Sequence, residues 1–166
     1  YFQHSDKAQV DILIVNKKDA YVRERAKALG IEQRYFPRED FYNSDKIVDL
    51  LTLRKTDLIV LAGFLWLVPQ NLLAAFPNKI VNIHPALLPA YGGKGMYGHH
   101  VHQAVIAARE SKSGITIHYV NEQYDRGDII FQAECSLTDQ DTVETLEEKI
   151  HLLEKEHYPK VIDSIL

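Results

Sequence analysis

Cysteine is almost absent from this sequence: among 166 residues only Cys135 carries a thiol, so no internal disulfide can form. That usage is consistent with a reducing cytosol. No uninterrupted apolar stretch approaches the ~20 residues that would span a bilayer, and Tyr1-Phe2-Gln3-His4 lacks the pattern of a signal peptide. We therefore expect a cytoplasmic protein with no membrane partner.

An excess of positive charge is also absent. The sequence has 19 Lys and Arg against 23 Asp and Glu, which gives a net charge of −4, and no long block of like charges occurs. Nucleic-acid binding relies on clustered Lys and Arg that face phosphates. We therefore expect no nucleic-acid partner.

The first half of the chain alternates short β-favouring runs with amphipathic helical stretches. We expect strands at 10–15, 33–36, 57–62 and 79–83, and helices at 20–29, 44–53 and 70–76. Such alternation predicts an α/β fold of the Rossmann-like kind, in which a mostly parallel sheet is flanked by helices.

The second half has a different pattern. A helix at 99–109 precedes strands at 114–120 and 128–136, which we expect to form an antiparallel pair. One long amphipathic helix then covers 142–166, bent or interrupted near Pro159 because proline lacks a backbone donor. No repeat or linker divides the sequence, and its length fits a single domain, 1–166.

The β-favouring run that begins at Lys79 ends on two polar residues spaced two apart, Asn82 and His84. In an extended segment such residues point to the same side, while Val81 and Ile83 turn into a core. Ligands of open α/β sheets bind at strand ends, and an amide beside an imidazole suits a reaction that forms an oxyanion. The alternative is an ordinary satisfied histidine at a strand terminus.

Three segments together resemble the folate-dependent formyltransferase family. They are Val60-Leu61-Ala62-Gly63-Phe64, then Asn82-Ile83-His84-Pro85 with Leu87-Leu88-Pro89, then His118-Tyr119-Val120 ahead of Asp125-Arg126-Gly127. The match runs from about Val10 to the C-terminus. Within the family, the chain is most similar to members that transfer a formyl group from 10-formyltetrahydrofolate to glycinamide ribonucleotide in purine synthesis.

The resemblance implies a catalytic triad of Asn82, His84 and Asp125. Asn82 would donate its amide hydrogen to the oxyanion. His84 would act as an imidazolium whose pKa a neighbouring carboxylate raises. Asp125 would be that carboxylate and would relay a proton through a water. Without the resemblance, Asp125 lies in a simple turn between strands.

The resemblance also implies the ligand contacts and a cis peptide bond before Pro89. The residues expected to bind the folate donor are Leu65, Leu67, Val68, Ile80, Val120, Asn121 and Tyr124. Glu154 matches a family glutamate that hydrogen-bonds the substrate ribose, and Pro85 would also contact the substrate. His118 would point toward the folate site or serve as a buried structural residue. The stretch Phe64–Pro69 has core packing as its ordinary alternative.

Two departures from the family pattern stand out. Members begin with a strand and a Gly-rich loop of the type Gly-Asn-Gly-Ser/Thr-Asn that holds the substrate phosphate, and this sequence starts at Tyr1 without one. We therefore expect an N-terminally incomplete formyltransferase domain. The stretch Ala90–His102 is also several residues longer than the family pattern.

Three histidines in four positions, His99, His100 and His102, invite a metal interpretation. No carboxylate or cysteine accompanies them at ligand spacing, and on a helix His100 would point about 100° away from the other two. We interpret them as a solvated helix start and expect no metal, since the family's reaction requires none.

Other functions remain open from sequence alone. The same core could act on methionyl-tRNA or an amino sugar nucleotide, or could hydrolyse formyltetrahydrofolate with water in place of the amine. A non-catalytic folate-binding module is an alternative of another class, against which the full set of Asn82, His84 and Asp125 argues. The sequence is compatible with a monomer or a homodimer.

Overall fold

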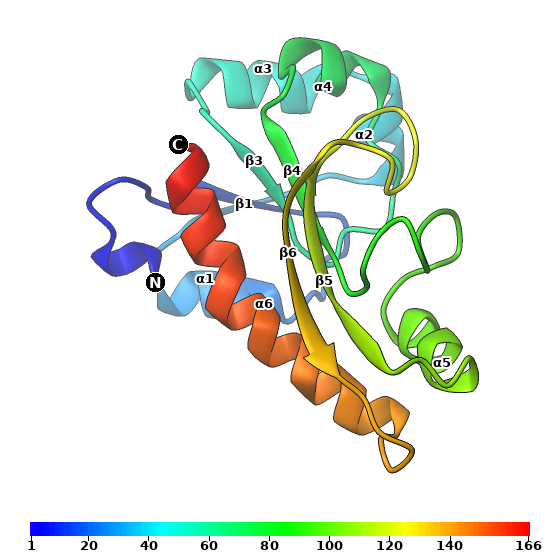
Figure 1. Cartoon of the computed structure of the whole chain (residues 1–166). Helices are drawn as coiled ribbons and strands as arrows, with labels where there is room; N and C mark the ends of the chain where they lie inside the picture. The colour runs from blue at the N-terminus through cyan, green and yellow to red at the C-terminus, as the bar shows by residue number, and fades with distance from the viewer.

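The computed structural model describes residues 1–166, and its helices and strands follow the expected alternation (Figure 1). In chain order they are η1 (Phe2–His4), β1 (Ile12–Val15), α1 (Val22–Ala28), β2 (Glu32–Tyr35), α2 (Arg38–Asn43), α3 (Lys46–Leu53), β3 (Ile59–Leu61), α4 (Gln70–Ala75), β4 (Ile80–His84), α5 (His99–Ala107), β5 (Lys112–Tyr119), β6 (Ile129–Ser136) and α6 (Val143–Ile165). Every strand and helix predicted from the sequence is present, with bounds within two residues of the prediction. No helix is both long and apolar enough to cross a membrane.

The strands form two sheets. Strands β1 and β2 pair in parallel, and the four others lie in the order β3-β4-β5-β6. Strand β3 is parallel to β4, whereas β5 is antiparallel to both β4 and β6. The predicted α/β class, with parallel strands, a C-terminal antiparallel pair and a long final helix, is confirmed. The β4–β5 pairing is one antiparallel pairing more than we predicted.

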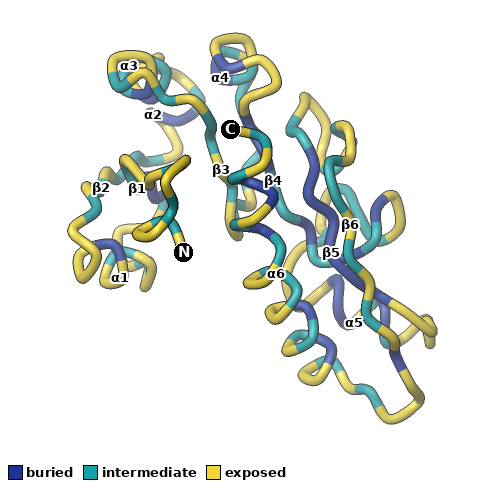
Figure 2. Tube along the Cα trace, turned by 60° about the vertical axis from the view of Figure 1, so that its left-hand side comes forward, coloured by how far each residue is buried: buried dark blue, intermediate teal, exposed yellow.

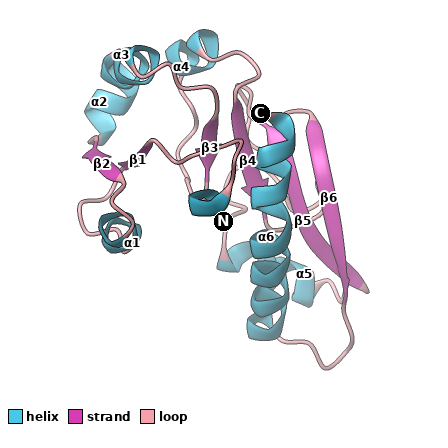
Figure 3. Cartoon of the chain, turned by 90° about the vertical axis from the view of Figure 1, so that its left-hand side faces the viewer, coloured by secondary structure: helices cyan, strands magenta, loops and turns pink.

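Three apolar clusters pack the helices against the strands. One lies between α2, α3, α4 and β4 and includes Phe41, Leu51 and Ile80. The other two lie between the antiparallel strands and the helices α5 and α6, around Ile115 and Ile117. Helix α6 runs along one face of the large sheet (Figure 3), and the buried segments of Figure 2 follow β4 and β5. The central strands are therefore covered from both sides.

Helix α6 is not interrupted at Pro159, although the sequence predicted a bend or break there. Thr142 and Thr145 form a capping box at its start. Near its end, the buried Tyr158 donates its hydroxyl hydrogen to the carbonyl oxygens of Leu61 (2.8 Å) and Val81 (3.4 Å). These hydrogen bonds to β3 and β4 fix helix α6 at the residue before Pro159, whose missing backbone N–H would otherwise weaken the helix.

One α-helix, α2, was not predicted from the sequence. Its six residues follow Pro37, and only the aromatic side chain of Phe41 is buried. Such a short segment shows too little of the 3.6-residue period to be recognised. Packing of Phe41 against Tyr42, Phe64 and Trp66 stabilises it, which is a long-range effect.

Candidate active site

Strand β4 brings Asn82 and His84 to the same side, as the alternation of a strand requires. Val81 and Ile83 contribute to an apolar cluster with α6. The strand ends at His84, directly before Pro85, which cannot donate to a neighbouring strand. Asn82 and His84 thus both face the cavity at the carboxyl end of a buried strand, as predicted, whereas Ile83, which was predicted to turn into the core, also lines that cavity.

Strand β5 adds His118, because the register of the β4–β5 pair places it opposite Asn82. The ring Nδ1 of His118 donates to the carbonyl oxygen of Tyr119 at 2.8 Å, so neutral His118 carries its hydrogen there. Its Nε2 lone pair then accepts from Asn82 Nδ2 at 3.3 Å. One amide hydrogen of Asn82 is occupied in this way, and the other is free for a ligand.

Asp125 reaches the same place from the loop between β5 and β6. Its backbone is in the left-handed region, with φ 54°, a conformation that favours glycine. The backbone N–H of Gly93 donates to Asp125 Oδ2 at 2.9 Å. The two carboxylate oxygens lie 3.6 Å from His84 Nδ1 and 3.6 Å from His118 Nε2. The three residues of the predicted triad therefore meet, although they come from separate segments.

A glycine makes the close approach of this loop to β5 possible. A Cβ on Gly127 would lie 1.7 Å from the carbonyl oxygen of Tyr119, which no side chain could tolerate. The Tyr119 N–H also donates to the carbonyl oxygen of Asp128 at 2.9 Å. This tight turn returns the chain toward β6 and leaves Asp125 over the end of β4.

The pKa values of the site depend on both charge and burial. Burial lowers the pKa of His84, and the carboxylate of Asp125 offsets only part of that effect. The predicted effect of the carboxylate is therefore present, since Asp125 raises the pKa of His84, but burial lowers that pKa by more. Burial alone would raise the pKa of Asp125, but its interaction with His118, the charge of His84 and the Gly93 N–H together lower it. A neutral imidazole beside an ionised carboxylate is the resting state that these shifts favour.

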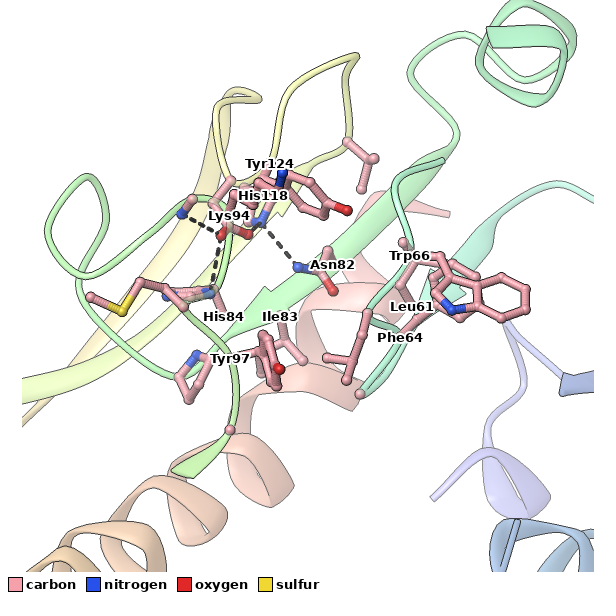
Figure 4. Close-up of a pocket in the computed structure, with 18 of the residues that line it drawn as sticks. Leu61, Phe64, Trp66, Asn82, Ile83, His84, Lys94, Tyr97, His118 and Tyr124 are labelled. Carbon is pink, nitrogen blue, oxygen red and sulfur yellow. Dashed lines mark hydrogen bonds and ion pairs between the residues drawn. The ribbon is translucent and has the colours of Figure 1, made fainter. Parts of the chain in front are cut away.

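These groups open into a cavity of about 510 Å³, a volume typical of small-molecule sites. Figure 4 shows Asn82, His84 and His118 directed toward one another on one side of it, with Phe64 and Trp66 on the other. The predicted site residues that line the cavity are Asn82, His84, Asp125, Leu65, Leu67, Val68, Val120, Asn121, Tyr124, Pro85, Glu154 and His118.

Ile80 does not line the cavity. Its side chain is 1% exposed and packs in the apolar cluster with Phe41 and Leu51. Ile80 lies two residues before Asn82 on β4, so strand alternation alone could not separate a wall residue from a core residue. The structure therefore shows Ile80 as a core residue beside the cavity, and its role at the donor site stays a prediction.

The cavity also has walls that sequence reasoning missed. The loop Gly93–Gly98 forms one wall, and the predicted cis bond before Pro89 is present in the turn that leads to it. His102 of α5 and His151 of α6 form part of another wall. His102 is buried, with Nδ1 lacking a hydrogen-bond partner, so the interpretation of a solvated helix start was wrong for this residue.

Glu154 lies on the same side as these histidines, on α6, and burial raises its pKa. Its carboxylate is therefore desolvated within a cavity wall rather than solvated on a helix surface. No group of three or more His, Cys, Asp or Glu side chains is arranged so that it could hold a metal ion.

Comparison with known proteins identifies the family of the chain. The model of the family described as formyl transferase matches residues 2–162. The chain is 42% identical over 161 residues to the chloroplastic phosphoribosylglycinamide formyltransferase of Arabidopsis thaliana, covering 94% of this chain and 55% of that protein. It is 39% identical over 163 residues to the phosphoribosylglycinamide formyltransferase of Bacillus subtilis, covering 96% and 81%.

Solved structures give the same result. The phosphoribosylglycinamide formyltransferase of Anaplasma phagocytophilum superimposes with a TM-score of 0.88 at 30% identity, over 99% of this chain and 76% of that chain. The enzyme of Bacillus halodurans gives 0.84 at 38% identity, over 96% and 81%. The chain therefore belongs to the formyl transferase family. Within it, these similar proteins all bear the name phosphoribosylglycinamide formyltransferase, and the chain spans little more than half the length of the plant relative.

Proposed function

We propose that this protein transfers the formyl group of 10-formyltetrahydrofolate to the primary amine of glycinamide ribonucleotide, a step of purine synthesis. The convergence of Asn82, His84 and Asp125 at one wall of the cavity is the observation that carries this proposal. The names of the similar proteins support the choice of amine.

The reaction forms a bond between the amine nitrogen and the formyl carbon, and breaks the bond between that carbon and the folate nitrogen. The formyl oxygen gains negative charge in between. One amide hydrogen of Asn82 is bonded to His118, which fixes the orientation of the amide group. The second amide hydrogen is free and can donate to the developing oxyanion. Asn82 therefore supplies a donor that needs no reorientation.

The attacking amine must lose a proton, and the departing folate nitrogen must gain one. Neutral His84 presents the Nδ1 lone pair toward the cavity and Asp125, so it can accept the first proton. The imidazolium so formed lies 3.6 Å from an Asp125 oxygen, which stabilises it until the proton passes on. This assignment makes His84 the base and Asp125 its electrostatic support.

The two substrates need different surroundings. The apolar side chains of Leu65, Leu67 and Val68 suit a flat heterocycle, and Asn121 and Tyr124 line the same cavity. Glu154, on α6, suits the hydroxyl groups of a sugar. We assign the first group of residues to the donor, and Glu154 with Pro85 to the amine substrate.

The experiment that tests this proposal follows the formyl carbon from the donor to its product. The protein is incubated with 10-formyltetrahydrofolate labelled in the formyl group, together with glycinamide ribonucleotide, an amino sugar nucleotide or buffer alone. We expect labelled formylglycinamide ribonucleotide in the first sample and unchanged donor in the others. Label on the amino sugar nucleotide would identify that compound, and not glycinamide ribonucleotide, as the acceptor. Labelled formate in every sample would identify a hydrolase instead.

A further inference from the structure

One permanently charged cation lines the cavity and has no role in the site described above. Lys94 is the only Lys or Arg among the lining residues, whereas the carboxylates of Asp125, Glu147 and Glu154 line the same space. Lys94 is exposed, and its ammonium group forms no ion pair with these or any other carboxylates. A positive charge is therefore free for a ligand at this wall.

Lys94 lies in a hydrogen-bonded turn. The Met96 N–H donates to the carbonyl oxygen of Gly93 at 3.0 Å, which closes a four-residue turn with Lys94 in its second position. Gly95 follows with φ 89°, the conformation that a type II turn requires of its third residue. The backbone at Lys94 is therefore fixed by the turn, although the side chain is exposed.

The same turn is joined to the loop that carries Asp125. The N–H of Gly93, the residue before Lys94, donates to Asp125 Oδ2 at 2.9 Å. Figure 4 shows Lys94 on the same side of the cavity as His118 and Tyr124. Asp125 itself interacts with Gly93 and with two imidazole rings, each 3.6 Å away, and not with Lys94. Lys94 therefore lies next to the catalytic groups while its ammonium group has no partner.

Both substrates of the proposed reaction are anions. The folate donor ends in glutamate carboxylates, and glycinamide ribonucleotide carries a phosphate. Each enters a cavity that three carboxylates line, and these repel a negative charge. An ammonium group at the wall offsets this repulsion, and it can donate up to three charge-assisted hydrogen bonds to oxygen.

We propose that Lys94 is a specificity-determining residue whose ammonium group binds an anionic oxygen of a substrate, in a carboxylate of the donor or in the phosphate of the amine. The identity of these two substrates rests on the proposed function. We expect the donor to be the source, because the turn of Lys94 is bonded to the loop that carries Asn121 and Tyr124, which we assigned to the donor. Lys94 binds and transfers no proton, so its loss should change KM and leave kcat.

The test compares the wild type with Lys94→Gln, which removes the charge and keeps a polar side chain. We expect the KM for the donor to rise about threefold to tenfold and kcat to stay the same. Lys94→Arg, which keeps the charge, should stay near the wild type. Added salt should raise the KM of the wild type more than that of Lys94→Gln, because salt screens an attraction that the variant lacks.

Lys155→Gln is the matched control, because Lys155 is exposed, lies outside the cavity lining and forms no ion pair. It should keep the wild-type KM for both substrates and the wild-type response to salt. A Lys155→Gln protein with the same rise in KM as Lys94→Gln would overturn the proposal, since the effect would then belong to the net charge of the protein.

Substrates that lack the anion identify its source. The pteroate form of the donor lacks the glutamate, and glycinamide riboside lacks the phosphate. Once the anion that Lys94 binds is removed, the wild type and Lys94→Gln should have equal KM values for that substrate. An effect on the amine that disappears with its phosphate would identify the phosphate as the anion and support the proposal. Wild-type KM values for both substrates in Lys94→Gln, or an effect that persists without either anion, would overturn it.

A binding measurement separates this inference from the proposed function. Trp66 is the only tryptophan and lines the same cavity, so its fluorescence reports ligands that bind there. With tetrahydrofolate and ribose 5-phosphate as probes, we expect the Kd of one of them to rise about threefold to tenfold in Lys94→Gln. A wild-type protein that shows this difference but forms no formylated amine would overturn the proposed function and support the role of Lys94. Formyl transfer by both proteins with equal Kd and KM values would overturn the role of Lys94 alone.

Discussion

Replacing Asp125 with asparagine should remove most of the activity and little of the stability. The side chain is 11% exposed and accepts a hydrogen bond from the Gly93 N–H, which an asparagine oxygen of the same shape can also accept. The new amide nitrogen can donate to a lone pair of His84 or His118. Asp125→Asn also removes a buried charge, so we expect the free energy of unfolding to change by less than about 1 kcal/mol.

The loss of activity can be worked out from the distance to His84. Two unit charges 3.6 Å apart attract each other by about 4–5 kcal/mol at an effective dielectric constant of ~20. With His84 as the base, this attraction exists only when His84 has accepted a proton, so it acts on the reacting state. Its loss corresponds to a fall in kcat of about 10³-fold, within the ~10²–10⁴ typical of proton-transfer groups.

The assay is single-turnover formation of the formylated amine at saturating concentrations of both substrates. Asp128→Asn is the matched control, because Asp128 lies in the same loop, exposed and without an ion pair, and should keep wild-type kcat. Urea unfolding of both variants checks stability. An Asp125→Asn protein within fivefold of wild-type kcat would refute the role given to this carboxylate.

Three further predictions concern other parts of the molecule. Because burial lowers the pKa of His84 below its ordinary 6.5, kcat/KM should fall only as the pH falls below 6.5. The free energy of unfolding should decrease over the same pH range, because the folded protein then has to hold a protonated, buried imidazole. A decrease in kcat/KM centred above pH 7 would contradict this. Tyr158→Phe leaves the carbonyl oxygens on β3 and β4 without their donor and should lower the free energy of unfolding by about 1–3 kcal/mol in urea titrations, whereas no change would show that these bonds are worth nothing. Leu65→Ala, at a cavity residue that is 49% exposed, should raise the KM for the donor about threefold to tenfold, or ~0.7–1.4 kcal/mol. The control Leu152→Ala, at a position 66% exposed and outside the cavity, should leave KM as it is, and equal effects would remove Leu65 from the donor site.

The elements of the fold were predictable because their patterns are local. The apolar run of β3 and the alternation around β4 are visible in a few residues, and helix α6 shows its period over many turns. Helix α2 was missed because Phe41 packs against residues more than twenty positions away. The antiparallel pairing of β4 with β5 was also missed, because it depends on how the chain returns after α5.

The residues of the site were likewise predictable where their placement depends on local sequence, and not where it depends on distant contacts. Strand alternation predicts that Asn82 and His84 share a side, and it needs no other information. The approach of Asp125 was inferred from family resemblance, because a left-handed backbone and a close-packed Gly127 leave no local signature. The carboxylate's effect on the pKa of His84 was predicted, but the larger opposing effect of burial was not, because the cost of burial cannot be inferred from sequence.

The central claim is that the amide of Asn82 stabilises the oxyanion while an imidazole and a carboxylate manage the proton. The most direct measurement is single-turnover transfer of a labelled formyl group to glycinamide ribonucleotide by the wild-type protein and by Asn82→Ala. We predict transfer by the wild type, and a rate ~10²–10³ lower in the variant with donor affinity unchanged. Equal rates in the two proteins, or label recovered only as formate, would contradict the account.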